Sequence, residues 1–150
     1  MKNEDLTFID FIVRSSWHRI SRLYNQKAAS HHTTMSVGFI LMMIEKEGTP
    51  STKLGPKMGM EPTSLSRTIQ HMEENGLIRR EFNDKDKRKV FIFLTEDGIA
   101  LRRIVRDSLV DFNTKCQKKL KKKELEAFFK VMQTIDETVE ELEHELTKSK

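Results

Sequence analysis

The stretch from residue 60 to residue 98 constrains the fold of this 150-residue chain more than any other segment. It reads MEPTSLSRTIQHMEENGLIRREFNDKDKRKVFIFLTEDG. Pro62 suits the first turn of a helix, because its missing N–H has no helical partner there, and Asn75-Gly76 is a typical helix end. Two strand-like runs, 77–82 and 90–94, then flank a polar tip. This order predicts a helix followed by a β-hairpin.

The predicted helix, residues 62–75, has an apolar face and a polar face. Leu65, Ile69 and Met72 recur at three- and four-residue steps and are expected in a core. The polar face carries Thr63, Ser64, Ser66, Arg67, Gln70 and His71. Such side chains donate and accept hydrogen bonds and fit a DNA major groove. A solvated polar face is the alternative, and the helix alone does not decide between the two.

The hairpin tip, residues 83–89, is strongly basic. Four cations lie within five residues: Lys85, Lys87, Arg88 and Lys89. Beside a polar helix, such a tip can follow the DNA backbone while its arginine enters the narrow, electronegative minor groove. Asp86 is then expected as a brace that orients the guanidinium through a paired hydrogen bond. The alternative for the tip is a solubilising loop.

Charge is distributed unevenly along the chain. Residues 1–75 carry a net charge of +1, residues 76–123 carry +8 and residues 124–150 carry −5. A basic middle segment indicates one surface that faces a polyanion. The lysine-rich corner at residues 115–123 is either a second DNA contact or a solvated corner offset by the acidic last helix, and we favour the solvated corner.

Long amphipathic helices are predicted at both ends of the chain. In the first, residues 6–29, apolar side chains recur at helical spacing. In the last, the apolar steps from Phe128 are 4, 3, 4, 3 and 4, close to the 3.5-residue period of helices that pack along one another. The small middle domain cannot bury both helices, so we expect them to bury each other across a homodimer. The expected dimerisation residues are Ile9, Ile12, Phe128, Met132, Ile135, Val139 and Leu142.

The remaining elements are shorter or join these. A second helix is predicted over residues 36–46, with its apolar side chains (Val37, Ile40, Leu41 and Ile44) facing inward. A third, from residue 51 or 52 to residue 59, should be short or distorted because Pro56 lies inside it. Thr95 caps a further helix. The single Cys116 excludes an internal disulfide framework and is expected to be a small buried hydrophobe.

Over residues 62–80 and 84–98, the sequence resembles the MarR family of bacterial winged-helix transcription regulators. The resemblance is carried by Gly76-Leu77-Ile78, by Asp86-Lys87-Arg88 and by Leu94-Thr95-Glu96-Asp97-Gly98. It implies residues 62–71 as the recognition helix, Arg88 as the minor-groove arginine, Asp86 as its brace, and Arg79 and Arg80 at the base of the wing. Gly55-Pro56 and the Ser36-Val37-Gly38-Phe39 segment depart from the family pattern.

The resemblance implies a mostly α fold with a small β-wing, in which a winged helix-turn-helix lobe is joined to terminal dimerisation helices. We expect an N-terminal dimerisation helix (1–34), a DNA-binding lobe (35–98), and a long connecting helix with a C-terminal dimerisation helix (99–150). Family members often bind small aromatic acids near the dimer helices. Arg14, Trp17 and His18 are the candidates for such an effector site, although packing of Trp17 and a surface role for Arg14 are favoured.

Several classes of function are not indicated. The chain lacks a Gly-rich phosphate loop, a nucleophile elbow and a His-Glu-x-x-His pair, so we expect no enzyme. The five histidines have no metal-ligand spacing, and neither a cofactor nor a metal is expected. The acidic start and the lack of a long apolar run indicate a cytoplasmic protein with no membrane partner.

From the helix, the wing and the resemblance together, we expect a homodimeric regulator that binds double-stranded DNA at a pseudo-palindromic operator, as a repressor released by a small effector. The alternative is a helical protein-protein interaction module.

Overall fold

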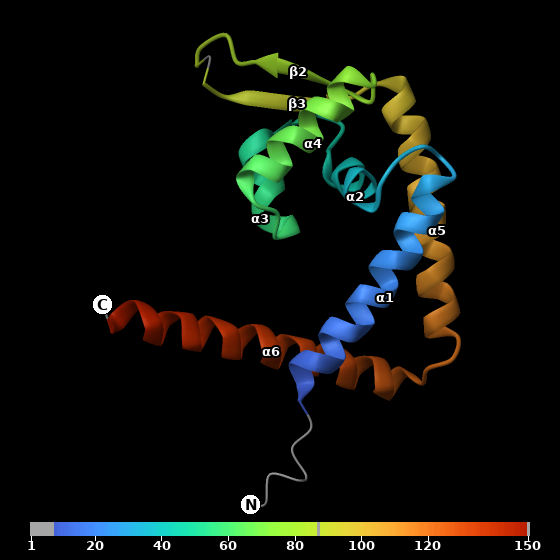
Figure 1. Cartoon of the computed structure of the whole chain (residues 1–150), viewed down its shortest axis with the longest axis vertical. Coiled ribbons are helices and arrows are strands. Elements are labelled where there is room, and N and C mark those ends of the chain that lie inside the picture. Colours follow the sequence, from blue (N-terminus) through green and yellow to red (C-terminus); the bar gives the residue numbers. More distant parts are fainter. Residues whose placement is uncertain (1–7, 87, 150) are drawn as a thin grey trace, which may run out of the picture. The chain divides into compact units, whose positions relative to one another are not determined.

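The computed structural model describes residues 8–86 and 88–149 (Figure 1). The helices are α1 (Ile9–Ala29), α2 (Met35–Met43), α3 (Leu54–Met58), α4 (Pro62–Glu74), α5 (Glu96–Gln117) and α6 (Lys122–Lys148), and a short 3-10 helix, η2 (Ser51–Lys53), precedes α3. The strands are β1 (Thr49–Pro50), β2 (Ile78–Phe82) and β3 (Val90–Leu94). The mostly α fold with a small β-wing is confirmed. The chain divides into two compact units within α5, between Ser108 and Leu109.

The sheet of the first unit has the antiparallel order β1-β3-β2. The predicted hairpin is present, with Arg80 opposite Ile92 and Phe82 opposite Val90. Strand β1 was not predicted from the sequence: Thr49 pairs with Ile92 and Pro50 with Phe91. Proline is tolerated there because β1 lies at the edge of the sheet. The pairing holds the start of η2 beside the wing.

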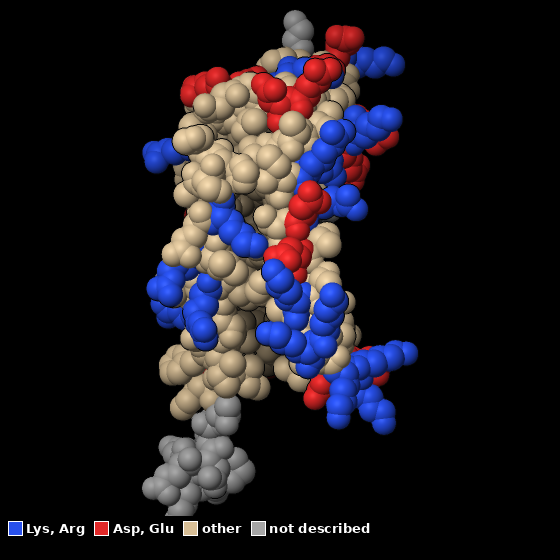
Figure 2. Space-filling model, turned by 90° about the vertical axis from the view of Figure 1, so that its right-hand side faces the viewer, with Lys and Arg blue, Asp and Glu red and all other residues tan. Residues whose placement is uncertain are grey.

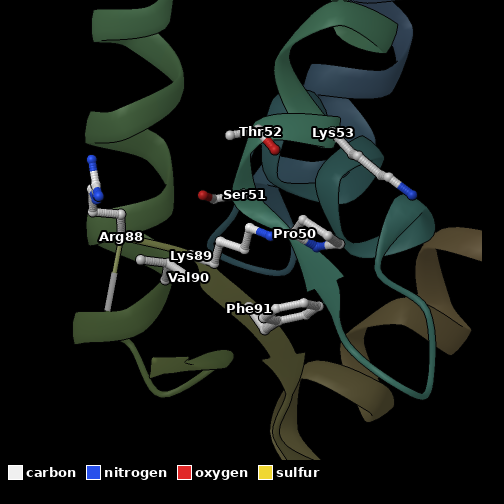
Figure 3. Close-up of a pocket in the computed structure, with 8 residues that line it drawn as sticks. All are labelled: Pro50, Ser51, Thr52, Lys53, Arg88, Lys89, Val90 and Phe91. Atoms are coloured by element: carbon white, nitrogen blue, oxygen red, sulfur yellow. The ribbon is translucent and has the colours of Figure 1, made fainter. Parts of the chain in front are cut away.

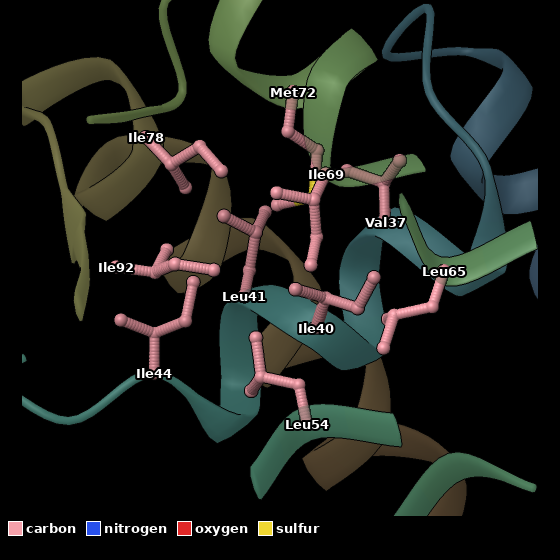
Figure 4. Packing of buried hydrophobic residues seen from close by; sticks show 10 residues of the cluster. All are labelled: Val37, Ile40, Leu41, Ile44, Leu54, Leu65, Ile69, Met72, Ile78 and Ile92. Atoms are coloured by element: carbon pink, nitrogen blue, oxygen red, sulfur yellow. The ribbon is translucent and has the colours of Figure 1, made fainter. Parts of the chain in front are cut away.

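The core of the first unit lies between α2, α3, α4 and the sheet (Figure 4). Its buried residues are Val37, Ile40, Leu41, Ile44, Leu54, Leu65, Ile69, Met72, Ile78 and Ile92. All the residues predicted to face inward from the second helix and from α4 are in this cluster. Burying such side chains contributes roughly 1.5–3 kcal/mol each, so the cluster fixes the orientation of α4.

The turn from α4 into the wing is closed by backbone hydrogen bonds. Gly76 N–H donates to Glu73 O at 2.9 Å and Leu77 N–H donates to Met72 O at 2.9 Å. Gly76 has φ of 70°, so it takes the left-handed conformation that ends many helices in this way. The predicted helix end at Asn75-Gly76 is therefore confirmed.

The second predicted helix differs from the prediction at its C-terminal end. α2 ends at Met43 and not at residue 46, because Ile44 is extended and the Thr49 hydroxyl accepts the Glu45 N–H at 2.9 Å. Arg102 of α5 supports that end by donating to Ile44 O at 2.8 Å. The third helix is short, as predicted, and is split into η2 and α3 before Gly59.

The terminal helices leave apolar side chains in solvent. On α1, Ile9, Ile12 and Trp17 are more than half exposed. The second unit, from Leu109 onward, contains the end of α5 and α6, and Phe128 and Leu142 on α6 are equally exposed. Cys116, predicted to be buried, is exposed in the single chain. Within the described ranges, no helix is both long and apolar enough to span a membrane.

Candidate nucleic-acid interface

The outer face of α4 carries the predicted polar residues. Thr63, Ser64, Ser66 and Arg67 are exposed on its first two turns. The opposite face is anchored by Leu65, Ile69 and Met72 in the core. A helix held on one side in this manner presents short donors and acceptors and one guanidinium on the other side.

The last two predicted residues of that face are engaged within α4. Gln70 Nε2 donates to Glu74 Oε1 at 2.9 Å. The His71 ring lies beside Asn75, whose Nδ2 is 3.2 Å from His71 Nδ1 and donates to His71 O at 2.7 Å. Their polar groups must exchange these partners before they can bind a base. The N-terminal half of α4 is therefore better prepared for contact than its C-terminal half.

Gly55 explains why α3 can approach α4. A Cβ atom at Gly55 would lie 3.1 Å from Leu65 Cδ2, tighter than ordinary contact. The Gly55-Pro56 departure from the family pattern thus leaves room beside α3 for the Leu65 side chain of the candidate recognition helix.

The wing tip is closed by its own hydrogen bonds. Asn83 N–H donates to Lys89 O at 3.0 Å, and Lys89 N–H donates to Asp86 O at 2.9 Å. The Lys85, Arg88 and Lys89 side chains are exposed, and that of Arg88 is 97% exposed. Lys87 lies outside the described residues. The described cations at the tip therefore face solvent beside these hydrogen bonds.

Asp86 contacts Arg88 in two ways through one oxygen. Asp86 Oδ1 accepts the Arg88 backbone N–H at 3.1 Å and lies 3.7 Å from Arg88 Nε. This is a backbone hydrogen bond plus an ion pair, without the two parallel hydrogen bonds expected of the brace. The carboxylate shapes the turn first and holds the guanidinium loosely.

Arg79 and Arg80 lie at the base of the wing, where both are engaged. The Arg79 guanidinium lies 4.5 Å from the centre of the Phe93 ring and pairs with Glu81. Arg80 Nε lies 2.8 Å from Glu73 Oε2, which joins β2 to the end of α4. Sequence reasoning missed the Glu73 contact because the two residues meet only after the turn at Gly76. Arg80 thus links the wing to α4, whereas the Arg79 contacts lie within the wing.

The candidate effector residues lie on α1. Trp17 stacks on Phe39 of α2, with ring centroids 6.3 Å apart and an interplanar angle of 23°. Tyr24 meets the same ring edge-on at 6.1 Å. Arg14 and His18 are exposed. Trp17 therefore packs α1 on α2 with one face and leaves half of its surface open.

The lysine-rich corner lies in the second unit, at the turn between α5 and α6. Figure 2 views the side of the molecule that carries this turn, where blue side chains project into solvent. Lys118, Lys119 and Lys121 are exposed, and Lys115 pairs with Asp111 at 2.8 Å. This exposure fits both a solvated corner and a second DNA contact, so the solvated corner stays a prediction. No cluster of three potential metal ligands occurs in the part of the chain that the structure describes.

Known proteins similar in sequence to this chain are named as transcriptional regulators. The sequence model of the MarR family matches residues 33–90. The chain is 29% identical over 93 residues to the HTH-type transcriptional regulator TtmR of Methylorubrum extorquens, covering 61% of this chain and 48% of that protein. It is 35% identical over 63 residues to the organic hydroperoxide resistance transcriptional regulator of Bacillus subtilis, covering 42% and 43%. The chain thus spans about half the length of these curated relatives.

Solved structures share the fold at low sequence identity. A complex of S. aureus MepR with DNA aligns with a TM-score of 0.81 at 18% identity, over 89% of this chain and 99% of that chain. The transcriptional regulator SlyA aligns with a TM-score of 0.79 at 19% identity, over 90% and 96%. At such identities the likeness shows the winged-helix fold.

Proposed function

Since residues 33–90 match the MarR family, we propose that this chain is a sequence-specific, double-stranded DNA-binding transcriptional regulator. The observation that carries the proposal is the pairing of two exposed elements on one core. The outer face of α4 carries Ser64, Ser66 and Arg67, and the wing carries Arg88 beside it in the same unit. The similar proteins TtmR and the organic hydroperoxide resistance regulator are transcriptional regulators, which supports the same proposal.

In this proposal α4 enters the major groove and the wing follows the backbone into the adjacent minor groove. The first two turns of α4 contact base edges, because hydroxyl and guanidinium groups read the patterns that the major groove displays. Lys85, Lys87 and Lys89 neutralise phosphates, and Arg88 enters the minor groove. Asp86 holds the turn from which Arg88 projects.

We also propose that the chain acts as a homodimer. Its support is the apolar surface left open on α1 and α6, which includes Ile9, Ile12, Phe128 and Leu142. Residues 1–34 and 99–150 would supply the interface and residues 35–98 the DNA-binding lobe. Two lobes on a two-fold axis require a pseudo-palindromic operator with half-sites about 34–36 Å apart. We assign it the role of repressor, because a dimer on such a site excludes other proteins from that DNA.

A small aromatic acid is the proposed effector. Its support is the open half of the Trp17 ring on α1, with exposed Arg14 and His18 on the neighbouring turns. The carboxylate of the acid would accept hydrogen bonds from the Arg14 guanidinium, and its aromatic ring would pack against the exposed part of Trp17. Binding there would act on the α1–α2 contact made by Trp17 and Phe39.

Selection of bound duplexes from a random pool tests the DNA-binding proposal. A regulator should enrich a two-fold symmetric sequence, and its log affinity should fall with log salt by about 0.9 per phosphate contacted. The same selection with aromatic acids present tests the effector. Failure to enrich any sequence, together with a flat salt response, would favour the protein-protein interaction module.

A further inference from the structure

A basic hollow lies between the start of η2 and the end of the wing, within the first unit. Residues 50–53 form one side and residues 88–91 form the other, and they enclose about 360 Å³ (Figure 3). The residues from 50 to 53 have no role in the groove contacts proposed above. The groove contacts proposed above therefore leave the 50–53 side of the hollow without an assigned role.

The composition of the hollow favours an anion. Its lining includes three cations, Lys53, Arg88 and Lys89, and no carboxylate. Ser51 and Thr52 add hydroxyl groups that can donate hydrogen bonds. In Figure 3 the Ser51 hydroxyl is directed toward the Arg88 side, whereas the Lys53 side chain extends away from Ser51 and Arg88. A group with several acceptor oxygens and a negative charge matches these donors.

The two sides of the hollow are held together by the sheet. Pro50 of β1 pairs with Phe91 of β3, so the segment that leads into η2 cannot move independently of the wing strand. Thr49, next to it, is buried and bonded to the Glu45 N–H. Pro50, Val90 and Phe91 contribute apolar walls, beside which charge-assisted hydrogen bonds are stronger than in open water. The backbone segments that carry the cations are thus placed before any ligand arrives.

We propose that this hollow binds one phosphate group of the DNA backbone, so that Ser51, Thr52 and Lys53 join the DNA-contacting surface. The inference rests on the proposed DNA-binding function. A backbone phosphate is favoured over a free one because Lys89, which lines the hollow, is also one of the wing cations assigned to phosphates, whereas Arg88 is assigned to the minor groove. A DNA strand that passes the wing therefore meets the hollow directly. Phosphate contacts fix register and orientation without reading sequence.

The test compares the salt dependence of DNA binding in matched variants of the full-length protein. Lys53→Met should reduce the slope of log affinity against log salt by about 0.9, the value for one lost phosphate contact. Ser51→Ala should weaken binding roughly 10-fold, the loss of a hydrogen bond to a charged group, and leave the slope unchanged. Both losses should be equal for cognate and unrelated duplexes. Lys130→Met, which removes the same charge from α6, should change neither quantity. Equal thermal midpoints would show that the variants are folded.

Duplexes with a single neutral methylphosphonate locate the phosphate. One position beside the wing should weaken wild-type binding, and at that position Lys53→Met should cause no further loss. An unchanged salt slope in Lys53→Met, with normal DNA binding by the wild type, overturns the inference and leaves the proposed function standing. Lack of DNA binding by the wild type overturns both. Inorganic phosphate can also be titrated while the NMR signals of Ser51 are followed. If those signals shift, and Lys53→Met leaves the slope of log DNA affinity against log salt unchanged, the hollow binds a free anion and the backbone assignment is overturned.

Discussion

Asp86 Oδ1 accepts the backbone N–H of Arg88 at 3.1 Å and lies 3.7 Å from Nε of the same arginine. One carboxylate oxygen thus shapes the wing turn and also attracts the side chain that the turn presents. The two effects can be separated by mutation. The backbone contact needs only an acceptor, whereas the guanidinium contact also needs the negative charge.

Arg88→Ala should weaken binding to the cognate operator by about 1–3 kcal/mol, the value of one well-placed base contact. Dimer mass and helicity should not change, because the side chain is 97% exposed. Arg88→Lys keeps the positive charge but loses the planar guanidinium with its several donors, so it should retain only part of the wild-type affinity. Titration of labelled operator measures all three proteins. Operator affinity equal to that of the wild type in Arg88→Ala would eliminate the wing assignment.

Asp86→Asn and Asp86→Ala separate the turn from the charge. Asparagine keeps an oxygen for the Arg88 N–H, so the turn should persist and only the ion pair should be lost. Exposed ion pairs contribute about 0–1 kcal/mol, so Asp86→Asn should bind DNA nearly as well as the wild type. Alanine removes both contacts and should weaken binding more. Equal losses in the two variants, measured by the same titration, would show that charge and not turn geometry is the role of Asp86.

Gly98→Ala should destabilise the protein by about 3 kcal/mol, at the upper end of overpacking effects. An added Cβ would lie on the Leu77 carbonyl oxygen, far inside contact distance, and backbone cannot give way as a side chain can. Gly76→Ala is the matched control, because its Cβ would meet nothing within 4 Å and only the positive φ of 70° is strained. That strain costs about 1–2 kcal/mol. Urea unfolding of both variants checks the order, and a smaller loss in Gly98→Ala would contradict it.

Sequence signals sufficed where local chemistry and the core agree. Pro62, Asn75-Gly76 and the spacing of Leu65, Ile69 and Met72 all specify the same helix, and α4 runs from Pro62 to Glu74. Strand β1 was not predicted because a strand of two residues has no periodicity in the sequence, and Ile92, which pairs with Thr49, lies far along the chain. The end of α2 was misplaced for a similar reason: Arg102 and Thr49 satisfy its last backbone groups only after folding.

Some features of the candidate site were also predicted from the sequence, and others were not. Exposure of the α4 face and of the wing tip followed from the apolar spacing and the charge run. The Gln70–Glu74 pair and the Arg80–Glu73 bridge did not, since they depend on which rotamers the folded neighbours select. The basic hollow needed residues 50–53 beside residues 88–91, an arrangement that only the β1–β3 pairing provides.

Arg102→Met should destabilise the first unit by roughly 1.5–3 kcal/mol, the contribution of hydrogen bonds from a charged donor. Arg102 Nη1 donates to Ile44 O at 2.8 Å and Nη2 lies 3.4 Å from Met42 O, so the variant leaves the end of α2 without these donors. Methionine keeps the apolar stem. Arg103→Met is the control, since Arg103 is exposed and surface changes usually stay within about 0.5 kcal/mol. Equal unfolding midpoints for the two variants would contradict the assigned role of Arg102.

The proposed dimer predicts different effects for two equally exposed valines of α6. Val139 is 48% exposed and lies on the apolar seam with Ile135 and Leu142, whereas Val131 is 49% exposed and lies off that seam. Val139→Lys buries a charge in a helix–helix interface and should raise the dimer dissociation constant more than 10-fold. Val131→Lys should leave it within about threefold, because its side chain meets no seam. Sedimentation across a concentration series measures both constants. Removal of residues 124–150 should yield monomer or aggregate, and a truncated chain that still forms an operator-binding dimer would place the interface outside α6.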